Sequence, residues 1–226
     1  MIFDEREKSI FGLLKEAIKE KLDFVVIGGY AINAYTLPRF SVDCDVVVRK
    51  KEEMEKFRKF LEKRGFSNRS KVVAVAYKGE FVSMASKEPL ATFDILSGSV
   101  EDRLSGTVFP ADFIFKYSSK RDIFGKGSPS KVEARVVDPE MLFIMKAVCG
   151  RSSDIRDVFM LASIKLDRKK LSDISSKFPL QYDCTKKILE TAGSKSFRDS
   201  LQGVYGKLPE PQFEATLKKL RSLLSA

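Results

Sequence analysis

The chain has 226 residues, of which 43% are hydrophobic and 32% charged, a balance typical of globular proteins and not of disordered ones. It contains no histidine, which excludes Ser-His-Asp and Cys-His catalytic systems and histidine metal sites. The three cysteines have no paired spacing and indicate neither a disulfide framework nor a thiolate zinc site. The formal net charge of +10 favours a polyanionic partner such as a nucleic acid or a nucleotide.

The sequence carries no membrane or export signal that we can identify. Its apolar stretches all fall short of the roughly 20 residues needed to cross a bilayer, and the first residues, MIFDEREK, are too charged and too acidic for a secretory signal. We therefore expect a cytoplasmic protein with no membrane partner.

The first part of the chain alternates between helical and strand patterns. Helices are predicted from their 3.6-residue apolar spacing and strands from their short β-branched runs. We expect helices at 3–22 and 50–65, strands at 24–27 and 41–48, and a short helical segment between Gly28-Gly29 and Pro38. Further strands are expected at 71–86, as two strands around a Lys78-Gly79 turn, at 90–96 and at 132–137. Residues 97–131 are rich in Gly, Ser and Pro, and their pattern predicts no definite element.

The pattern becomes helical from Asp138-Pro139 onward, a pair typical of a helix start. Six helices are expected, at 139–149, 153–165, 167–177, 181–192, 196–204 and 210–225. This shift predicts a core domain at residues 1–138 and a helical domain at 139–226 packed on it. The order of elements indicates an α+β fold.

Two aspartates stand at the head of an apolar run in SVDCDVVV. Side chains alternate along a strand, so Asp43 and Asp45 project from the same face. Two carboxylates so close repel unless a cation lies between them, and Mg²⁺ or Mn²⁺ is the hard ion that oxygen ligands favour. A solvated pair of acids is the alternative explanation of this motif taken alone.

Gly28 and Gly29 strengthen the first explanation. Glycine allows positive φ and close approach of a ligand, and backbone amides at a helix start can hold phosphate oxygens. A third acid, Asp94, lies within ATFDILSG on another apolar strand. If this strand pairs beside the Asp43 strand, three carboxylates converge as in metal-dependent phosphoryl-type transfer; the alternative is a strand acid satisfied by a turn amide.

The motif GGYA, followed by RFSVDCD and a later strand aspartate, resembles the nucleotidyltransferase superfamily that includes DNA polymerase β. Within it, the chain is most similar to the AbiEii toxin-like nucleotidyltransferases. The core resemblance covers residues 24–96, and a looser one continues through PEMLFIMKAVCGRSSDIRDVFML. It implies a mixed β-sheet flanked by helices and followed by a C-terminal helical bundle.

The resemblance also implies roles for individual residues. Gly28 and Gly29 would contact nucleotide phosphates, while Asp43, Asp45 and Asp94 would bind Mg²⁺ or Mn²⁺, with Asp94 able to act as the base. Arg39 and Ser41 match the R-x-S portion of the motif and would help to bind the nucleotide. The superfamily often has Gly-Ser where this chain has Gly-Gly, so position 29 offers no hydroxyl.

The looser resemblance implies that Lys146 reaches the nucleotide phosphates or the reacting centre. A lysine suits this role as a point charge, and a solvated lysine on an apolar helix is the alternative. Asp154 and Asp157 are three residues apart and can share one helical face. They fit either a functional role or pairing with Arg151 and Arg156.

The resemblance implies a metal-dependent nucleotidyltransferase that moves a nucleoside monophosphate from a nucleoside triphosphate to an acceptor hydroxyl. An RNA acceptor such as tRNA agrees with the positive charge, and a protein or small-molecule acceptor fits the same chemistry. The toxin-like group further implies an antitoxin partner. The alternative is a non-catalytic protein that binds nucleic acid or a partner and keeps the fold without the reaction.

Overall fold

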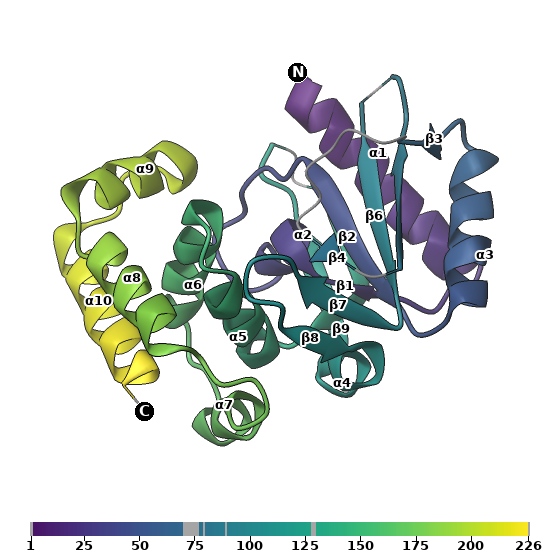
Figure 1. Cartoon of the computed structure of the whole chain (residues 1–226). Helices are drawn as coiled ribbons and strands as arrows, with labels where there is room; N and C mark the ends of the chain where they lie inside the picture. The colour runs from purple at the N-terminus through teal and green to yellow at the C-terminus, as the bar shows by residue number, and fades with distance from the viewer. Residues whose placement is uncertain (1, 70–76, 79, 89, 128–129, 226) are drawn as a thin grey trace. The chain divides into compact units, whose positions relative to one another are not determined.

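The computed structural model describes residues 2–69, 77–78, 80–88, 90–127 and 130–225. The chain divides into two compact units (Figure 1). The first comprises Met1–Ala34 and Pro38–Asp138, and the second comprises Tyr35–Leu37 and Pro139–Ala226. We describe each unit by itself.

A mixed seven-stranded sheet forms the centre of the first unit, with strand order β3-β5-β6-β2-β1-β10-β9. Its strands are β1 (Val25–Val26), β2 (Asp43–Val48), β3 (Ser67–Asn68), β5 (Phe81–Ala85), β6 (Thr92–Ser97), β9 (Ser118–Phe124) and β10 (Lys131–Val137). The β2–β6 and β1–β10 pairs are parallel, and the other pairs are antiparallel. The expected mixed sheet of an α+β fold is therefore confirmed.

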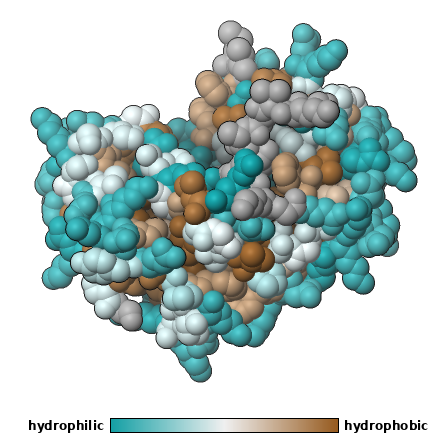
Figure 2. Space-filling view, viewed as in Figure 1, coloured by the Kyte–Doolittle hydropathy of each residue, from teal (hydrophilic) through white to brown (hydrophobic). Residues whose placement is uncertain are grey.

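Two long helices, α1 (Ile2–Lys19) and α3 (Lys51–Glu62), belong to this unit. Ion pairs from Arg64, just after α3, to Glu16 and Glu20 join the two helices. Phe57 of α3 packs its ring against Phe93 of β6, so α3 covers one face of the sheet. Its outer surface is hydrophilic (Figure 2), as expected for an amphipathic helix.

The region around Lys78 differs from our expectation of a simple two-stranded hairpin. The strand β4 (Tyr77–Lys78) does not pair with β5 but with β7 (Ser99–Asp102), which in turn pairs with β8 (Val108–Pro110). These three strands form a separate small sheet. The partners of β5 are β3 and β6, because strand pairing depends on distant segments that local alternation does not reveal. Residues 71–76 and Gly79 of the expected hairpin lie outside the described residues.

The region that predicted no definite element, 97–131, is largely ordered into strands and one helix. It supplies β7, β8, the short helix α4 (Ala111–Lys116) and β9. Seven residues of β9 pair with β10 in continuous antiparallel register. The sheet thus gains an edge strand that the local sequence pattern does not indicate.

The second unit contains the six expected helices. They are α5 (Pro139–Cys149), α6 (Ser152–Ser163), α7 (Arg168–Ser175), α8 (Tyr182–Ala192), α9 (Lys195–Tyr205) and α10 (Glu210–Leu224). The ring of Phe159 on α6 packs against Phe197 of α9 and Phe213 of α10. The apolar faces that the sequence shows at helical spacing therefore form the core of this unit.

Candidate active site

Two neighbouring parallel strands hold three acidic residues. In the pairing of β2 with β6, Asp45 lies opposite Asp94 and Asp43 lies opposite Thr92. Phe93 faces α3, so its neighbour Asp94 points to the opposite face of the sheet, which it shares with Asp43 and Asp45. We expected the three carboxylates to converge if the Asp94 strand pairs beside the Asp43 strand. The β2–β6 pair is that pairing.

Burial sets the electrostatics of this face. Desolvation raises the pKa of Asp43, against the opposing effects of the Arg69 charge, a hydrogen bond from Thr92 and the Arg6 charge. Desolvation also raises the pKa of Asp94, which accepts a hydrogen bond from Ser83 and feels the negative charge of Asp43. Both carboxylates are therefore costly to keep ionised without a further positive partner.

One oxygen of each carboxylate lacks a hydrogen bond. Among the residues that the structure describes, Oδ1 of Asp43 and Oδ1 of Asp94 are buried with no hydrogen-bond partner. Nη1 of Arg69 lies 3.9 Å from Oδ1 of Asp43, beyond hydrogen-bond range. Buried polar atoms normally have partners, so unsatisfied ones at a site point to a ligand or ion.

These oxygens suit a hard divalent cation, since carboxylates are the ligands that Mg²⁺ and Mn²⁺ prefer. Within the described part of the chain, no three His, Cys, Asp or Glu side chains are gathered closely enough to hold a metal as they stand. The donor set thus fits in chemistry and in its unsatisfied oxygens. To hold one ion together, the three carboxylates would have to come closer than the structure places them.

Gly28 and Gly29 lie directly against this acidic face. The Ile27 backbone N–H donates to the Asp45 carbonyl at 3.0 Å, which brings the start of the short helix α2 (Gly28–Ile32) beside β2. Gly28 has φ +66°, and a Cβ placed there would overlap the Asp45 carboxylate. A Cβ at Gly29 would overlap the Ser41 hydroxyl. A side chain at either position would therefore displace Asp45 or Ser41, and Gly28 also has a positive φ that glycine adopts without strain.

The segment carrying Arg39 and Ser41 is held by a buried side chain. Asn33 donates through Nδ2 to the Arg39 carbonyl at 2.9 Å and accepts from the Arg39 N–H at 3.0 Å. The Ser41 hydroxyl donates to the Asp43 carbonyl at 3.2 Å. Arg39 Nη1 lies 3.2 Å from the position that a Cβ on Gly29 would occupy. This clamp places a guanidinium and a hydroxyl beside the glycines.

Sequence reasoning missed several residues of this site. Arg6 and Arg69 act on Asp43 by charge, while Ser83 and Thr92 supply hydrogen bonds to the acids. Ser83 lies opposite Asp94 in the β5–β6 pair. It could have been found only if that strand register had been known. Arg6 lies on α1, far away in sequence, and no local pattern could have found it.

The remaining predicted site residue, Lys146, lies on α5 of the helical unit. Its Nζ is 2.7 Å from Asp154 Oδ1 and 3.1 Å from Asp157 Oδ2, and Arg151 Nε is 2.6 Å from Asp154 Oδ2. The side chains of Lys146, Asp154 and Asp157 are only 13%, 2% and 0% exposed. The solvated-lysine alternative is therefore wrong.

This cluster shows which residues pair with Asp154 and Asp157, the two acids of α6. Asp154 pairs with Arg151, as one alternative expected, but Arg156 donates to Ser200. Burial alone would raise the pKa of Asp154, but the charges and hydrogen bonds of Lys146 and Arg151 outweigh it and hold this pKa below its ordinary value. The cluster is a buried four-membered ion network.

The fold and the site together define a nucleotidyltransferase-type protein. The family model of the AbiEii nucleotidyl transferase toxins, of a type IV toxin–antitoxin system, matches residues 13–226. The chain belongs to this family. The resemblance to the AbiEii toxin-like nucleotidyltransferases is thereby confirmed. Nucleotidyl transfer is the activity of this class, so the enzyme interpretation is favoured over the non-catalytic alternative.

Two solved structures of ANT(2'')-Ia show the same fold at low sequence identity. The crystal structure of ANT(2")-Ia in complex with adenylyl-2"-tobramycin aligns at 14% identity and a TM-score of 0.51, over 76% of this chain and 95% of that one. The solution structure of the antibiotic-resistance factor ANT(2'')-Ia aligns at 14% identity and a TM-score of 0.50, over 78% and 92%. The lincosamide antibiotic adenylyltransferase LnuA with bound lincomycin has 19% identity and a TM-score of 0.49, over 70% and 98%.

No match is found among curated proteins. In the described ranges, no helix is long and apolar enough to span a membrane.

Proposed function

We propose that this nucleotidyltransferase moves a nucleoside monophosphate from a nucleoside triphosphate to an acceptor hydroxyl in a reaction that requires Mg²⁺ or Mn²⁺ and releases pyrophosphate. The observation that carries the proposal is the pair of unpartnered buried oxygens on Asp43 and Asp94. They lie on the same face as Asp45, whose carboxylate packs against Gly28. A buried carboxylate without a partner costs stability, and a functional ligand offsets that cost.

Asp43, Asp45 and Asp94 are the residues that would hold the metal. When bound, the ion would neutralise triphosphate oxygens and stabilise charge that develops on them. Asp94 is in addition our candidate to accept the proton of the attacking hydroxyl, since it lies beside the metal-binding pair on the neighbouring strand.

The other residues of this face would bind and orient the nucleotide. The absence of side chains at Gly28 and Gly29 allows phosphate oxygens to approach the backbone. Arg39 supplies a planar guanidinium suited to phosphate, and the hydrogen bonds of Asn33 to its backbone hold it in place. Ser41 fixes the start of β2 through the Asp43 carbonyl.

We propose Lys146 as a phosphate-binding residue, with the family resemblance as its support. Two buried acids hold its ammonium at a fixed position. A point charge positioned in this way is pre-organised for phosphate.

An RNA acceptor is proposed because the net charge is +10 and polyanions bind basic proteins by releasing counterions. A role as the toxin of a toxin–antitoxin pair, with an antitoxin protein as partner, is proposed from the family match alone. The proposed setting is the cytoplasm.

The test is calorimetric titration with each nucleoside triphosphate, with Mg²⁺ and with EDTA. We expect the affinity to depend on Mg²⁺ and to fall by more than about tenfold in Asp43→Asn, a loss that even indirect metal-site mutations produce. The matched control is Asp112→Asn, which removes an equal charge from a largely exposed position on α4. Equal affinity with and without Mg²⁺ in a folded sample would refute the metal-dependent mechanism.

A further inference from the structure

Three segments of the first unit meet next to the acidic face and present two aromatic rings. Phe3 of α1 and Phe40, which lies just before β2, have ring centroids 5.2 Å apart at an interplanar angle of 30°. Phe3 is 52% exposed and Phe40 is 37% exposed. We call this pair the Phe3–Phe40 platform.

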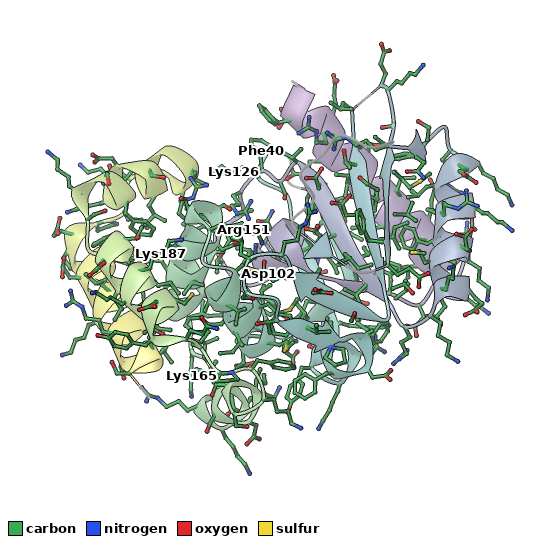
Figure 3. The ribbon with its side chains drawn as sticks, viewed as in Figure 1. Phe40, Asp102, Lys126, Arg151, Lys165 and Lys187 are labelled. Carbon is green, nitrogen blue, oxygen red and sulfur yellow. The ribbon has the colours of Figure 1, made fainter. Side chains whose placement is uncertain are left out.

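The platform rests on a fixed base. Glu7, a fully buried acid of α1, accepts hydrogen bonds from the backbone N–H groups of Lys126 and Gly127 at 2.9 and 3.2 Å. Gly127 fits closely against the Asp4 carboxylate, which a Cβ there would overlap, and against Phe40, whose Cζ would lie 3.0 Å from that Cβ. Figure 3 labels Phe40, from the segment before β2, and Lys126, from the segment after β9. A buried carboxylate thus secures the turn that supports an exposed ring.

Two arginines connect the platform to the acidic face. The Arg6 guanidinium lies 5.6 Å from the Phe3 ring centroid, and its charge acts on Asp43. Arg6 Nε donates to the Leu90 carbonyl at 2.6 Å. Arg39 donates to the Phe40 carbonyl at 3.2 Å and also lies against Gly29. Arg6 is buried, with 7% exposure, and belongs to the base of the platform, whereas the half-buried Arg39 joins Phe40 to the glycine pair of the nucleotide site.

This combination fits an unpaired nucleobase and its phosphate. Bases stack on aromatic side chains while arginines hold the backbone, which is how proteins bind single strands. The positive charge of the chain complements a polyanion and disfavours a basic protein partner.

The exposure of Phe3 favours the acceptor over the donor as the source of the base. Small nucleotides are usually enclosed over most of their surface, whereas an open platform leaves the strand free to continue past the stacked base. We propose that the Phe3–Phe40 platform stacks an unpaired base of a single-stranded nucleic-acid acceptor and so guides the strand toward the acidic face. This inference rests on the proposed nucleotidyl transfer and assigns the acceptor class.

The test measures the binding of a short fluorescent oligoribonucleotide by anisotropy. Its comparison probes are an oligodeoxyribonucleotide of the same sequence and an abasic strand of the same length. The variants are Phe3→Leu and Phe40→Leu, which keep apolar volume but remove the ring, and Phe40→Tyr, which restores a ring. Tyr182→Ala is the matched control, because it removes a largely exposed aromatic ring from α8 in the helical unit.

We expect each leucine variant to weaken binding of the base-bearing strand on the order of tenfold, the loss of one base–aromatic stack. Phe40→Tyr and Tyr182→Ala should bind like the wild type, and the abasic strand should not distinguish any of the variants. Preference between the RNA and DNA probes identifies the sugar of the acceptor. Circular dichroism checks that each variant is folded.

Three results would overturn the proposal. The first is that the wild type binds the abasic strand as tightly as the base-bearing strand, or binds neither. The second is that the leucine variants bind the base-bearing strand as tightly as the wild type does. The third is a loss confined to nucleoside triphosphate affinity, which would make the platform a donor-base site. Mg²⁺-dependent triphosphate binding by the wild type is measured separately, so failure of the proposed function is visible independently of the oligonucleotide result.

Discussion

Replacement of Lys146 by methionine tests the buried ion network of the helical unit. Lys146 and Arg151 carry two positive charges, and Asp154 and Asp157 carry two negative charges, so the network is neutral. Methionine keeps most of the side-chain length and removes one positive charge. Two carboxylates that are at most 2% exposed would then lose the ammonium that they share.

The distances give the scale of the effect. With an effective dielectric constant of about 20, a separation of 2.7 Å corresponds to about 6 kcal/mol and one of 3.1 Å to about 5 kcal/mol, before desolvation is subtracted. Removing one partner of a buried pair costs about 3–5 kcal/mol net. For a chain of this size, this corresponds to a fall in Tm of about 6–20 °C.

Thermal unfolding followed by circular dichroism measures this cost. The matched control is Lys186→Met, which removes an exposed lysine that lies 3.9 Å from Glu190; such surface pairs contribute about 0–1 kcal/mol. The double variant Lys146→Met/Asp157→Asn restores neutrality and should recover much of the lost Tm.

The reasoning would be refuted if Lys146→Met unfolded within a degree or two of the control. It would also fail if the double variant were no more stable than the single one. Either result would mean that the network is not the stabilising unit that its burial and distances indicate. An activity measurement on Lys146→Met is informative only at a temperature where the variant is folded.

Three further changes have expected outcomes that follow from the structure. In EDTA, Asp94→Asn should raise Tm near neutral pH. Burial raises the pKa of Asp94 in the folded state above its ordinary value, so the ionised acid destabilises the fold, and the gain in Tm should vanish as the pH falls toward about 4. A gain in Tm that persists at that pH would contradict this assignment. Gly29→Ala should lower Tm because its Cβ would overlap Ser41, whereas Gly12→Ala on α1 meets nothing within 4 Å and should raise stability by about 0.5–1 kcal/mol; equal shifts in the two would refute the close packing. The stability that depends on the low pKa of Asp154 should be present above the ordinary aspartate pKa and be lost as the pH falls through the lower pKa of the folded state. The difference in Tm between the wild type and Asp154→Asn should therefore shrink in acid. A difference in Tm that stays constant with pH would contradict the ion network.

Much of the fold follows from local patterns. The six C-terminal helices were predicted because apolar residues at 3.6-residue spacing need only their own neighbours to form a helix. The alternation in SVDCDVVV likewise placed Asp43 and Asp45 on one face. The glycine pair was predicted as a close-approach site, and the structure gives the reason in the overlaps that a Cβ would meet.

Other features required contacts between distant segments. No local signal indicates that β4 pairs with β7 or that β9 closes the sheet edge beside β10. Lys146 was predicted as a single phosphate ligand, but its partners, eight and eleven residues further along, are brought to it by the packing of α5 against α6. Arg6 acts on Asp43 and Phe3 meets Phe40 only because α1 is brought to these segments by tertiary packing.

The sequence by itself determined the types of chemical group available, because the absence of histidine and the spacing of glycines and aspartates are properties of the chain. It also determined the positions of the helices and which side chains of a strand share one face of the sheet, since both depend on short-range periodicity. Only the tertiary structure decided that Asp94 lies opposite Asp45, that two carboxylate oxygens are buried without partners, and that two phenylalanines remain exposed beside them. Register, burial and desolvation arise when distant segments exclude water together, and no local pattern of residues contains that information.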